Sequence, residues 1–165
     1  MSVVIQIASS SEHPSRDELT LWTETSRASI ASASLREIVL RLVDETEMSE
    51  LNNTYRGKPG PTNVLSFVTE LPDTVLNPSE SKDTTEQIED LPLGDIVICA
   101  PVVALEAKEQ NKPLLAHWCH MVTHGVLHLH GLDHIKKTDA VIMEALETQI
   151  LAKLGFPDPY LALDH

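Results

Sequence analysis

The stretch HGVLHLHGLDH, from His124 to His134, constrains this chain more than any other part of it. In a helix, with about 100° of rotation per residue, the side chains of His124 and His128 lie one turn apart on the same face. Gly131 predicts the end of that helix, because glycine readily takes a positive φ. A chain that turns back there returns His134 to the first two histidines, and imidazoles in this arrangement are typical zinc ligands. We therefore predict a site for one zinc ion on His124, His128 and His134, with a fourth position left for water.

The residues before this stretch extend the helix and give it two unlike faces. His117 and His120 fall, with the first two predicted ligands, within a stripe of roughly 80°. The opposite face should pack into the core, and it consists of Leu115, Trp118, Val122, Val126 and Leu129. The pattern predicts a helix over residues 114–130. Two interpretations stay open for His117 and His120, which either contact the ligands or only line the cleft. His130 lies off the stripe, and we assign it no role in the site.

Gly125 argues against one familiar use of such a site. Zinc peptidases of the pattern H-E-x-x-H-x-x-G-x-x-H carry a glutamate after the first histidine, which delivers the proton that the leaving amine needs. This chain has Gly125 there, so peptidase activity is disfavoured unless a carboxylate is supplied from elsewhere. A phosphodiester makes different demands, because its anionic oxygens bind a metal ion directly and nearby positive charge helps. The general base of such a reaction is left unassigned.

The rest of the chain predicts a single α+β domain over residues 1–165, with about four strands and four to six helices. Strands are expected at 3–8, 35–43, 63–70 and 95–99, where β-branched and apolar residues run together. Helices are expected at 17–33, at 49–55 with Ser49 as its cap, from Pro101 onward, and at 138–154.

Two polar regions are assigned to the surface. Residues 72–92 are acidic and show no apolar period, so we expect an exposed, mobile loop. This loop contains no histidine or cysteine, and we expect it to be dispensable for metal binding. Glu144 and Glu147 are assigned to the solvated face of the last helix.

The overall composition narrows the possible functions. No apolar run of 18 residues is present, so we expect no membrane-spanning helix. The N-terminal residues lack the pattern of a secretory signal, and Cys99 and Cys119 lie in apolar segments, which favours a reduced, cytoplasmic protein. The net charge of −13 argues against a broad, non-specific grip on nucleic acid, so RNA binding needs a local positive spot.

The segment RGKPGP, from Arg56 to Pro61, breaks regular structure and supplies a candidate for that spot. A guanidinium can hold a phosphate through two parallel hydrogen bonds. From the residues alone, a solvated loop arginine is the simpler interpretation of Arg56. Thr62, Asn63 and Ser66 either line the cleft or serve turn and strand chemistry.

Four blocks together resemble the YbeY family of bacterial rRNA maturation factors. HWCHMVTHGVLHLHGLDH is similar to the family pattern H-G-x-L-H-L-x-G-[aromatic]-D-H, with Leu132 at the aromatic position. LNNTYRGKPGPTNVLSF resembles a Y-R-G-K loop followed by P-T-[DN]-V-L-S-F, with Pro59 and Gly60 in place of more polar residues. LGDIVIC and MEALETQILAKLGFPDPY also look like segments of the family. The resemblance covers most of the chain from Leu51 to Tyr160.

This resemblance implies a zincin-like α+β domain whose central helix carries zinc on His124, His128 and His134. It also implies a metal-dependent, single-strand-specific endoribonuclease in 16S rRNA 3′-end maturation and ribosome quality control. The expected partners are RNA, the small ribosomal subunit and assembly factors. The family's key basic residue corresponds to Arg56, which is then expected to be catalytic. Asp133, beside a ligand, either orients a histidine or caps a turn.

A function of another class is also compatible with these motifs. A ribosome-assembly factor could use zinc to shape a docking surface and have little hydrolytic activity of its own. Gly125 and the acidic net charge suit that alternative. The two functions differ in the effect of Arg56→Ala. A catalytic arginine predicts loss of function with fold, metal content and ribosome binding intact, whereas a docking factor should lose binding as well.

Overall fold

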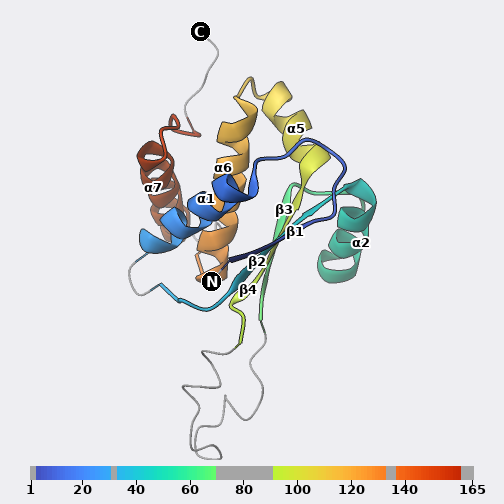
Figure 1. Ribbon diagram of the computed structural model, residues 1–165, viewed down its shortest axis with the longest axis horizontal. Helices are drawn as coiled ribbons and strands as arrows, with labels where there is room; N and C mark the ends of the chain where they lie inside the picture. The colour runs from blue at the N-terminus through green and yellow to red at the C-terminus, as the bar shows by residue number, and fades with distance from the viewer. Residues whose placement is uncertain (1–2, 31–32, 70–90, 133–136, 161–165) are drawn as a thin grey trace, which may run out of the picture.

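A four-stranded sheet organises the protein (Figure 1). The structure, a computed structural model, describes residues 3–30, 33–69, 91–132 and 137–160, with side chains in the last range from residue 140 on. The strands are β1 (Val3–Ile7), β2 (Ile38–Val43), β3 (Val64–Val68) and β4 (Gly94–Cys99). Their order is β1-β2-β4-β3, with the first three parallel and β3 antiparallel at one edge. The predicted α+β class and the four predicted strands are confirmed.

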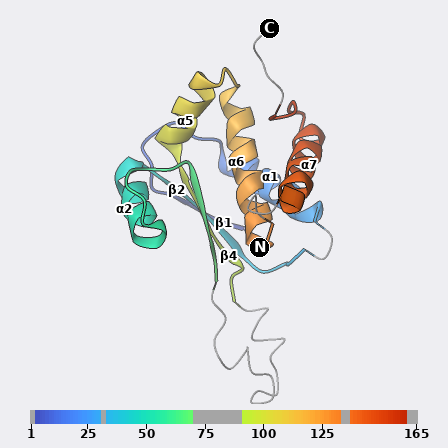
Figure 2. The ribbon, with the colours of Figure 1, turned by 180° about the vertical axis from the view of Figure 1, so that it is seen from behind.

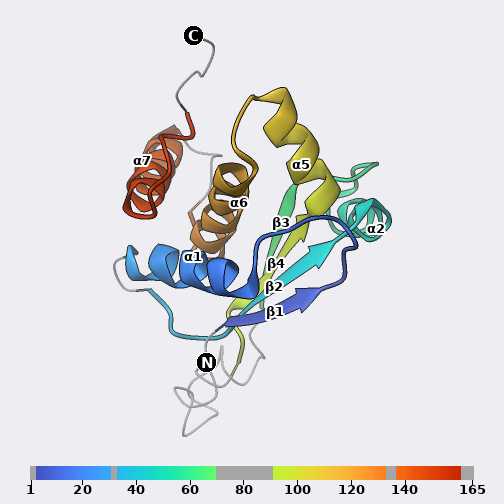
Figure 3. The same ribbon diagram turned by 45° about the horizontal axis from the view of Figure 1, so that its top comes forward.

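Five helices are present in the described part of the chain. They are α1 (Arg16–Ala28), α2 (Glu45–Arg56), α5 (Ala100–Glu109), α6 (Leu114–Leu129) and α7 (Lys137–Lys153). Helices α1 and α6 pack on one face of the sheet, α7 packs against α6, and α2 contacts β4 (Figure 3). Seen from behind, α2 and α7 lie on opposite sides of the sheet (Figure 2). None of the helices described here is long and apolar enough to cross a membrane.

The two faces of the sheet are covered unequally, and successive side chains of a strand point to opposite faces. One face packs in the core, whereas the other is only partly covered and exposes Asp95. On β4, Ile96 and Ile98 join the larger core, which includes Trp118 of α6. Val97 points the other way and packs in a second cluster with Met48 of α2. Each of these buried side chains stabilises the fold by about 1.5–3 kcal/mol relative to exposure. The two clusters fix α6 and α2 on opposite faces of the same strand.

The start of α2 differs from the predicted one. Ser49 does not cap this helix, because α2 begins at Glu45 with Asp44 as its N-cap residue. The hydroxyl of Ser49 donates instead to the Glu45 carbonyl, one turn earlier in the helix, at 2.7 Å. The acidic first turn suits the positive end of the helix dipole, and this pattern is a better start signal than a lone serine.

Two further boundaries and one position on a helix face also differ from the predictions. Helix α1 ends at Ala28 rather than at residue 33, and β2 begins at Ile38 rather than at residue 35. Leu115, assigned to the core face of α6, is 42% exposed, whereas the other four residues of that face are buried. Most of the loop predicted at 72–92 lies outside the described residues.

The packing of α6 on β4 explains why residue 125 is a glycine. A Cβ atom on Gly125 would lie 2.6 Å from Cγ2 of Ile96, and 3.1 and 3.2 Å from two other carbons of that side chain. Ile96 is fully buried, and its β-branched side chain has little rotameric freedom. This packing leaves no room for the glutamate that zinc peptidases carry at the corresponding position.

We expect Gly125→Ala to lower the free energy of unfolding by about 1–2 kcal/mol. Overpacking costs about 1–3 kcal/mol, and the gain in helix propensity returns less than about 1 kcal/mol. Urea unfolding followed by circular dichroism measures the change. In Ile96→Ala the clash is relieved, so the double variant should lose less stability than the sum of the two single variants. A Gly125→Ala protein more stable than the parent would contradict this account.

Candidate functional site

Helix α6 and the edge strand β3 border a cavity of about 310 Å³. The cavity is lined by two histidines on one face of α6, by the last residue of α2, and by residues in and just before β3. The lining residues are Arg56, Thr62, Asn63, Val64, Leu65, Ser66, His124 and His128. The structure thus brings together the predicted catalytic arginine and two of the three predicted zinc ligands.

The rings of His124 and His128 have centroids 4.5 Å apart, as expected for neighbours one helical turn apart. Gly131 ends the helix region with φ of 90°, as predicted. His134, the third predicted ligand, and Asp133 lie outside the described residues. Among the residues described, no group of three or more metal-binding donors forms. The three-histidine zinc site therefore remains a prediction.

Glu147 of α7 is fully buried, and its assignment to a solvated helix face is wrong. Its Oε1 lies 3.2 Å from Nδ1 of His124, and its Oε2 contacts Nε2 of His120. The hydroxyl of Tyr160 donates to Oε2 at 2.7 Å. Glu144, one turn earlier, is exposed as predicted. A signal was present in the sequence, because Glu147 falls on the helical stripe of the apolar residues Met143, Ile150 and Leu151, which are buried.

The carboxyl group of Glu147 is strongly acidic in this setting. Burial by itself raises its pKa, but hydrogen bonds from His120, His124 and Tyr160 outweigh that effect and lower the pKa to about 2. The pKa of Tyr160 shifts upward, because burial disfavours the phenolate and the hydroxyl donates to the Glu147 carboxylate. A carboxylate at this place is a hydrogen-bond acceptor only.

A second carboxylate, Glu106 of α5, pairs with His117. Nε2 of His117 lies 2.9 Å from Glu106 Oε1, and the amide of Asn63 donates to both carboxylate oxygens at 3.2 Å. Burial raises the pKa of Glu106, but these bonds outweigh it and the pKa is lowered. His117 and His120 thus contact carboxylates, and neither is among the described residues lining the cavity. His120 shares its carboxylate partner, Glu147, with the predicted ligand His124. His117 pairs with Glu106, which contacts no predicted ligand among the described residues.

His130 connects the end of α6 to the segment before β2. Its Nδ1 donates to the Val126 carbonyl at 2.8 Å, and its Nε2 then accepts from the Ser34 amide at 3.3 Å. Both ring nitrogens serve backbone contacts, which fits the prediction that His130 has no role in the site. Ser66 of β3 donates to the Gly125 carbonyl at 3.3 Å and ties the edge strand to α6.

Arg56 is the last residue of α2 rather than a loop residue. Gly57 follows it with φ of 65°, and the Gly57 amide donates to the carbonyls of Asn52 and Asn53. A cation in the last helical turn is also favoured by the helix dipole. The side chain of buried Asn52 donates to the Gly60 carbonyl at 2.9 Å and fastens the following loop to the helix. The helix end therefore sets where Arg56 meets the cavity.

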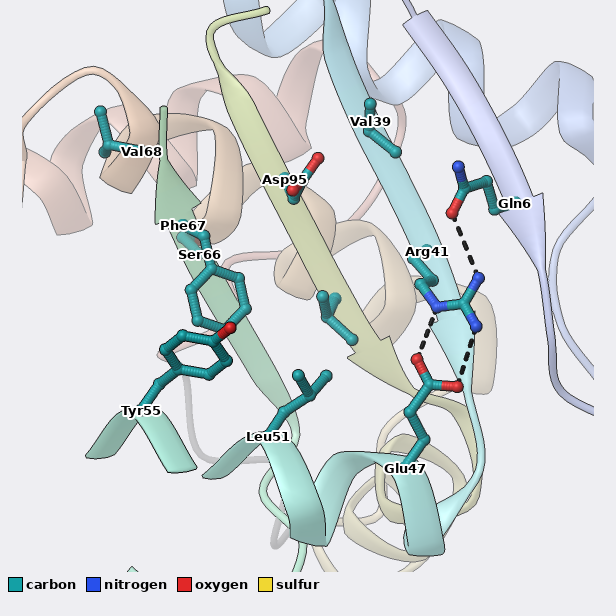
Figure 4. A pocket seen from close by; sticks show the side chains of 11 residues that line it. Gln6, Val39, Arg41, Glu47, Leu51, Tyr55, Ser66, Phe67, Val68 and Asp95 are labelled. Atoms are coloured by element: carbon teal, nitrogen blue, oxygen red, sulfur yellow. Dashed lines mark hydrogen bonds and ion pairs between the residues drawn. The ribbon is translucent and has the colours of Figure 1, made fainter. Parts of the chain in front are cut away.

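A larger groove of about 700 Å³ lies beside α2 and the sheet strands (Figure 4). Its arginine, Arg41, donates to Glu47 from Nε at 2.6 Å and Nη2 at 2.9 Å, and to Gln6 from Nη1 at 3.2 Å. The rings of Tyr55 and Phe67 meet edge to face, with centroids 5.0 Å apart. The described lining of this groove contains no histidine, and a carboxylate neutralises its arginine. The smaller cavity is therefore the better candidate for metal-assisted chemistry.

We expect Asn52→Ala to lower the free energy of unfolding by about 1 kcal/mol, because it removes the hydrogen bond from the buried Asn52 side chain to the Gly60 carbonyl. Asn53→Ala, at the exposed neighbouring position, should change it by no more than about 0.5 kcal/mol. Urea unfolding of both variants measures the difference. Equal stability of the two variants would show that this bond does not hold the loop.

Comparisons with known proteins agree with the motifs and with the fold. The family model described as "Endoribonuclease YbeY" matches residues 6–155. The endoribonuclease YbeY of Alcanivorax borkumensis is 50% identical over 161 residues, which is 96% of this chain and 86% of that protein.

The solution structure of TM1509 from Thermotoga maritima has a similar fold, with a TM-score of 0.54 and 22% sequence identity. The match covers 96% of this chain and 99% of that one. At this identity the likeness shows the fold alone. The family model and the relative from Alcanivorax borkumensis match the sequence itself over most of the chain. The chain therefore belongs to the YbeY family of endoribonucleases.

Proposed function

We propose that this endoribonuclease is zinc-dependent and specific for single strands, and that it acts in 16S rRNA 3′-end maturation and ribosome quality control. We place it in the cytoplasm, with the small ribosomal subunit and its assembly factors as partners. The observation that carries the chemical part is the shared cavity of Arg56, His124 and His128. The rRNA role and the ribosomal partners rest on the family resemblance.

The donor set fits zinc well. We assign the ion to His124, His128 and His134, three ligands of the type that catalytic zinc sites use. The hydrogen bond from Nδ1 of His124 to Glu147 supports this assignment, because metal-binding histidines usually donate their other ring nitrogen to a carboxylate or carbonyl. When bound, zinc would supply positive charge to a phosphate and make water more acidic.

Arg56 has the role of holding the scissile phosphate. Its guanidinium can donate two parallel hydrogen bonds to phosphate oxygens and stabilise the charge that grows on them during cleavage. It reaches the cavity from α2, opposite the histidines of α6.

The general base stays unassigned among the described residues. Gly125 replaces the peptidase glutamate, and neither Glu106 nor Glu147 lines the cavity. Both carboxylates are already bonded to buried histidines. An attack by the RNA 2′-hydroxyl would explain a preference for RNA over DNA.

A preference for single strands agrees with the charge of the chain. A net charge of −13 opposes the extended phosphate contacts that bind duplexes non-specifically. A small cavity whose described lining has one arginine, with zinc bound beside it, would suit a single phosphate of a flexible strand.

We expect Arg56→Ala to slow RNA cleavage by about 10²–10³-fold, the usual loss when one charge-stabilising donor is removed. The cleavage rate of Arg56→Lys should lie between those of the parent and Arg56→Ala, because lysine keeps the charge and loses the paired hydrogen bonds. The assay compares a single-stranded RNA spanning the 3′ end of precursor 16S rRNA with the same RNA in a duplex. Lys58→Ala, an exposed cation two residues away and outside the described cavity lining, is the matched control.

The result also separates the enzyme from a docking factor. Zinc content, circular dichroism and binding to small ribosomal subunits are measured on the same preparations. Loss of cleavage with these three properties intact supports a catalytic Arg56. Loss of subunit binding together with cleavage favours docking, and parental cleavage by Arg56→Ala would refute the role of Arg56.

We expect His128→Ala to lower the zinc content from about one ion per chain and to lose cleavage, because it removes a ligand. His13→Ala, whose ring contacts the Pro14 carbonyl far from the cavity lining, should keep its zinc. Elemental analysis of dialysed protein gives the zinc content. Chelation should also lower the melting temperature of the parent, because bound zinc stabilises the folded state. A His128→Ala protein that retains a full complement of zinc would contradict the ligand assignment.

A further inference from the structure

We propose that Glu147 is a positioning residue of the metal site, and that its buried carboxylate holds the ring of His124 so that Nε2 is presented to the metal. This inference rests on the zinc site of the proposed function. It assigns a role to a residue that the sequence pattern had placed on the surface.

The contact between Glu147 and His124 determines where the proton of that ring lies. Oε1 of Glu147 is 3.2 Å from Nδ1 of His124. An ionised carboxylate can only accept, so the hydrogen of this bond belongs to Nδ1. A neutral imidazole with its hydrogen on Nδ1 carries its lone pair on Nε2, and a metal ligand has to offer a lone pair. Glu147 therefore selects both the orientation and the tautomer that a metal at Nε2 requires.

The carboxylate itself is held from its other side. Oε2 of Glu147 contacts Nε2 of His120 and accepts from the Tyr160 hydroxyl at 2.7 Å. The segment that carries Tyr160 is anchored in turn, because Nζ of Lys112 donates to the Pro159 carbonyl at 2.8 Å. With both oxygens engaged and no exposed surface, the carboxylate has little freedom to turn away from His124.

A purely structural tie between α6 and α7 makes a different prediction, and the chain contains a natural comparison for it. Glu106, which is half-buried, pairs with the buried His117, but that ring is not among the described residues lining the cavity. If the pairs serve only to join helices, loss of either carboxylate should affect folding and leave zinc affinity alone. If Glu147 positions a ligand, only its loss should weaken zinc binding.

The test is the zinc affinity of full-length protein, measured by competition with a chromophoric chelator. We expect Glu147→Gln to bind zinc 10–100-fold more weakly than the parent, the usual effect of losing the outer partner of a metal ligand. Glu144→Gln makes the same change of charge at an exposed position one turn earlier, and should bind like the parent. Glu106→Gln removes the other carboxylate that pairs with a buried histidine of α6, and should also bind like the parent.

A second measurement needs no zinc. Nitrogen-15 NMR of the imidazoles in metal-free protein reports which ring nitrogen carries the hydrogen. We expect His124 to be the Nδ1–H tautomer in the parent and to lose that preference in Glu147→Gln. A role limited to joining helices would not require one tautomer of His124.

Each outcome supports or overturns the proposal. Parental zinc affinity in a folded Glu147→Gln protein, or an Nε2–H tautomer of His124 in the parent, overturns it. If Glu147→Gln does not fold, Tyr160→Phe removes one of the donors described for Glu147 and should give a smaller loss of zinc affinity. Parental affinity of a folded Tyr160→Phe protein would then overturn the proposal. If the parent binds no zinc, the proposed zinc site fails first, and that result is distinct because Glu144→Gln and Glu106→Gln would then bind none either.

Discussion

Helix α6 depends on the pairing of its buried imidazoles with carboxylates from neighbouring helices. A buried imidazole without a partner destabilises the fold, because its ring nitrogens lose the hydrogen bonds that water would provide. Glu106 of α5 and Glu147 of α7 provide an acceptor for one ring nitrogen of each of three residues, the buried His117 and His120 and the half-buried His124. These bonds attach α5 and α7 to α6 on its histidine side, while its apolar side packs on the sheet. His124 and His128 remain at the cavity as a consequence of that arrangement.

In the proposed function, the position of the cavity lets a chain of net charge −13 act on RNA. The arginine and the histidines converge at one small cavity beside β3, the strand at the edge of the sheet. Arg41, the arginine of the larger groove, is already paired with Glu47. In the proposed function, Arg56 therefore meets one phosphate rather than a long stretch of backbone. This agrees with an endoribonuclease, the activity of the family to which the chain belongs.

Local rules predicted much of the fold, and they failed where tertiary contacts decide. The 3.6-residue period located α6, and a glycine with positive φ was expected at residue 131. The start of α2 was misplaced because a serine and an acidic turn are competing cap signals. Glu147 was misassigned because a glutamate on a helix is usually solvated, and only its partners on α6 and beyond make burial favourable. Its position on the same helical stripe as buried apolar residues indicated that it could be buried.

The sequence by itself determined the period of the histidine helix, the order of the strands along the chain and the motifs of the family, because these depend on residues close together in the chain. Tertiary structure alone decided which residues meet. It brought Arg56 to His124 and His128 across β3, and it placed Gly125 against Ile96, where a longer side chain has no room. It also buried Glu147 between α6 and the residues after α7. Such contacts join positions far apart in the chain, and their free energy depends on packing and desolvation that no local pattern records.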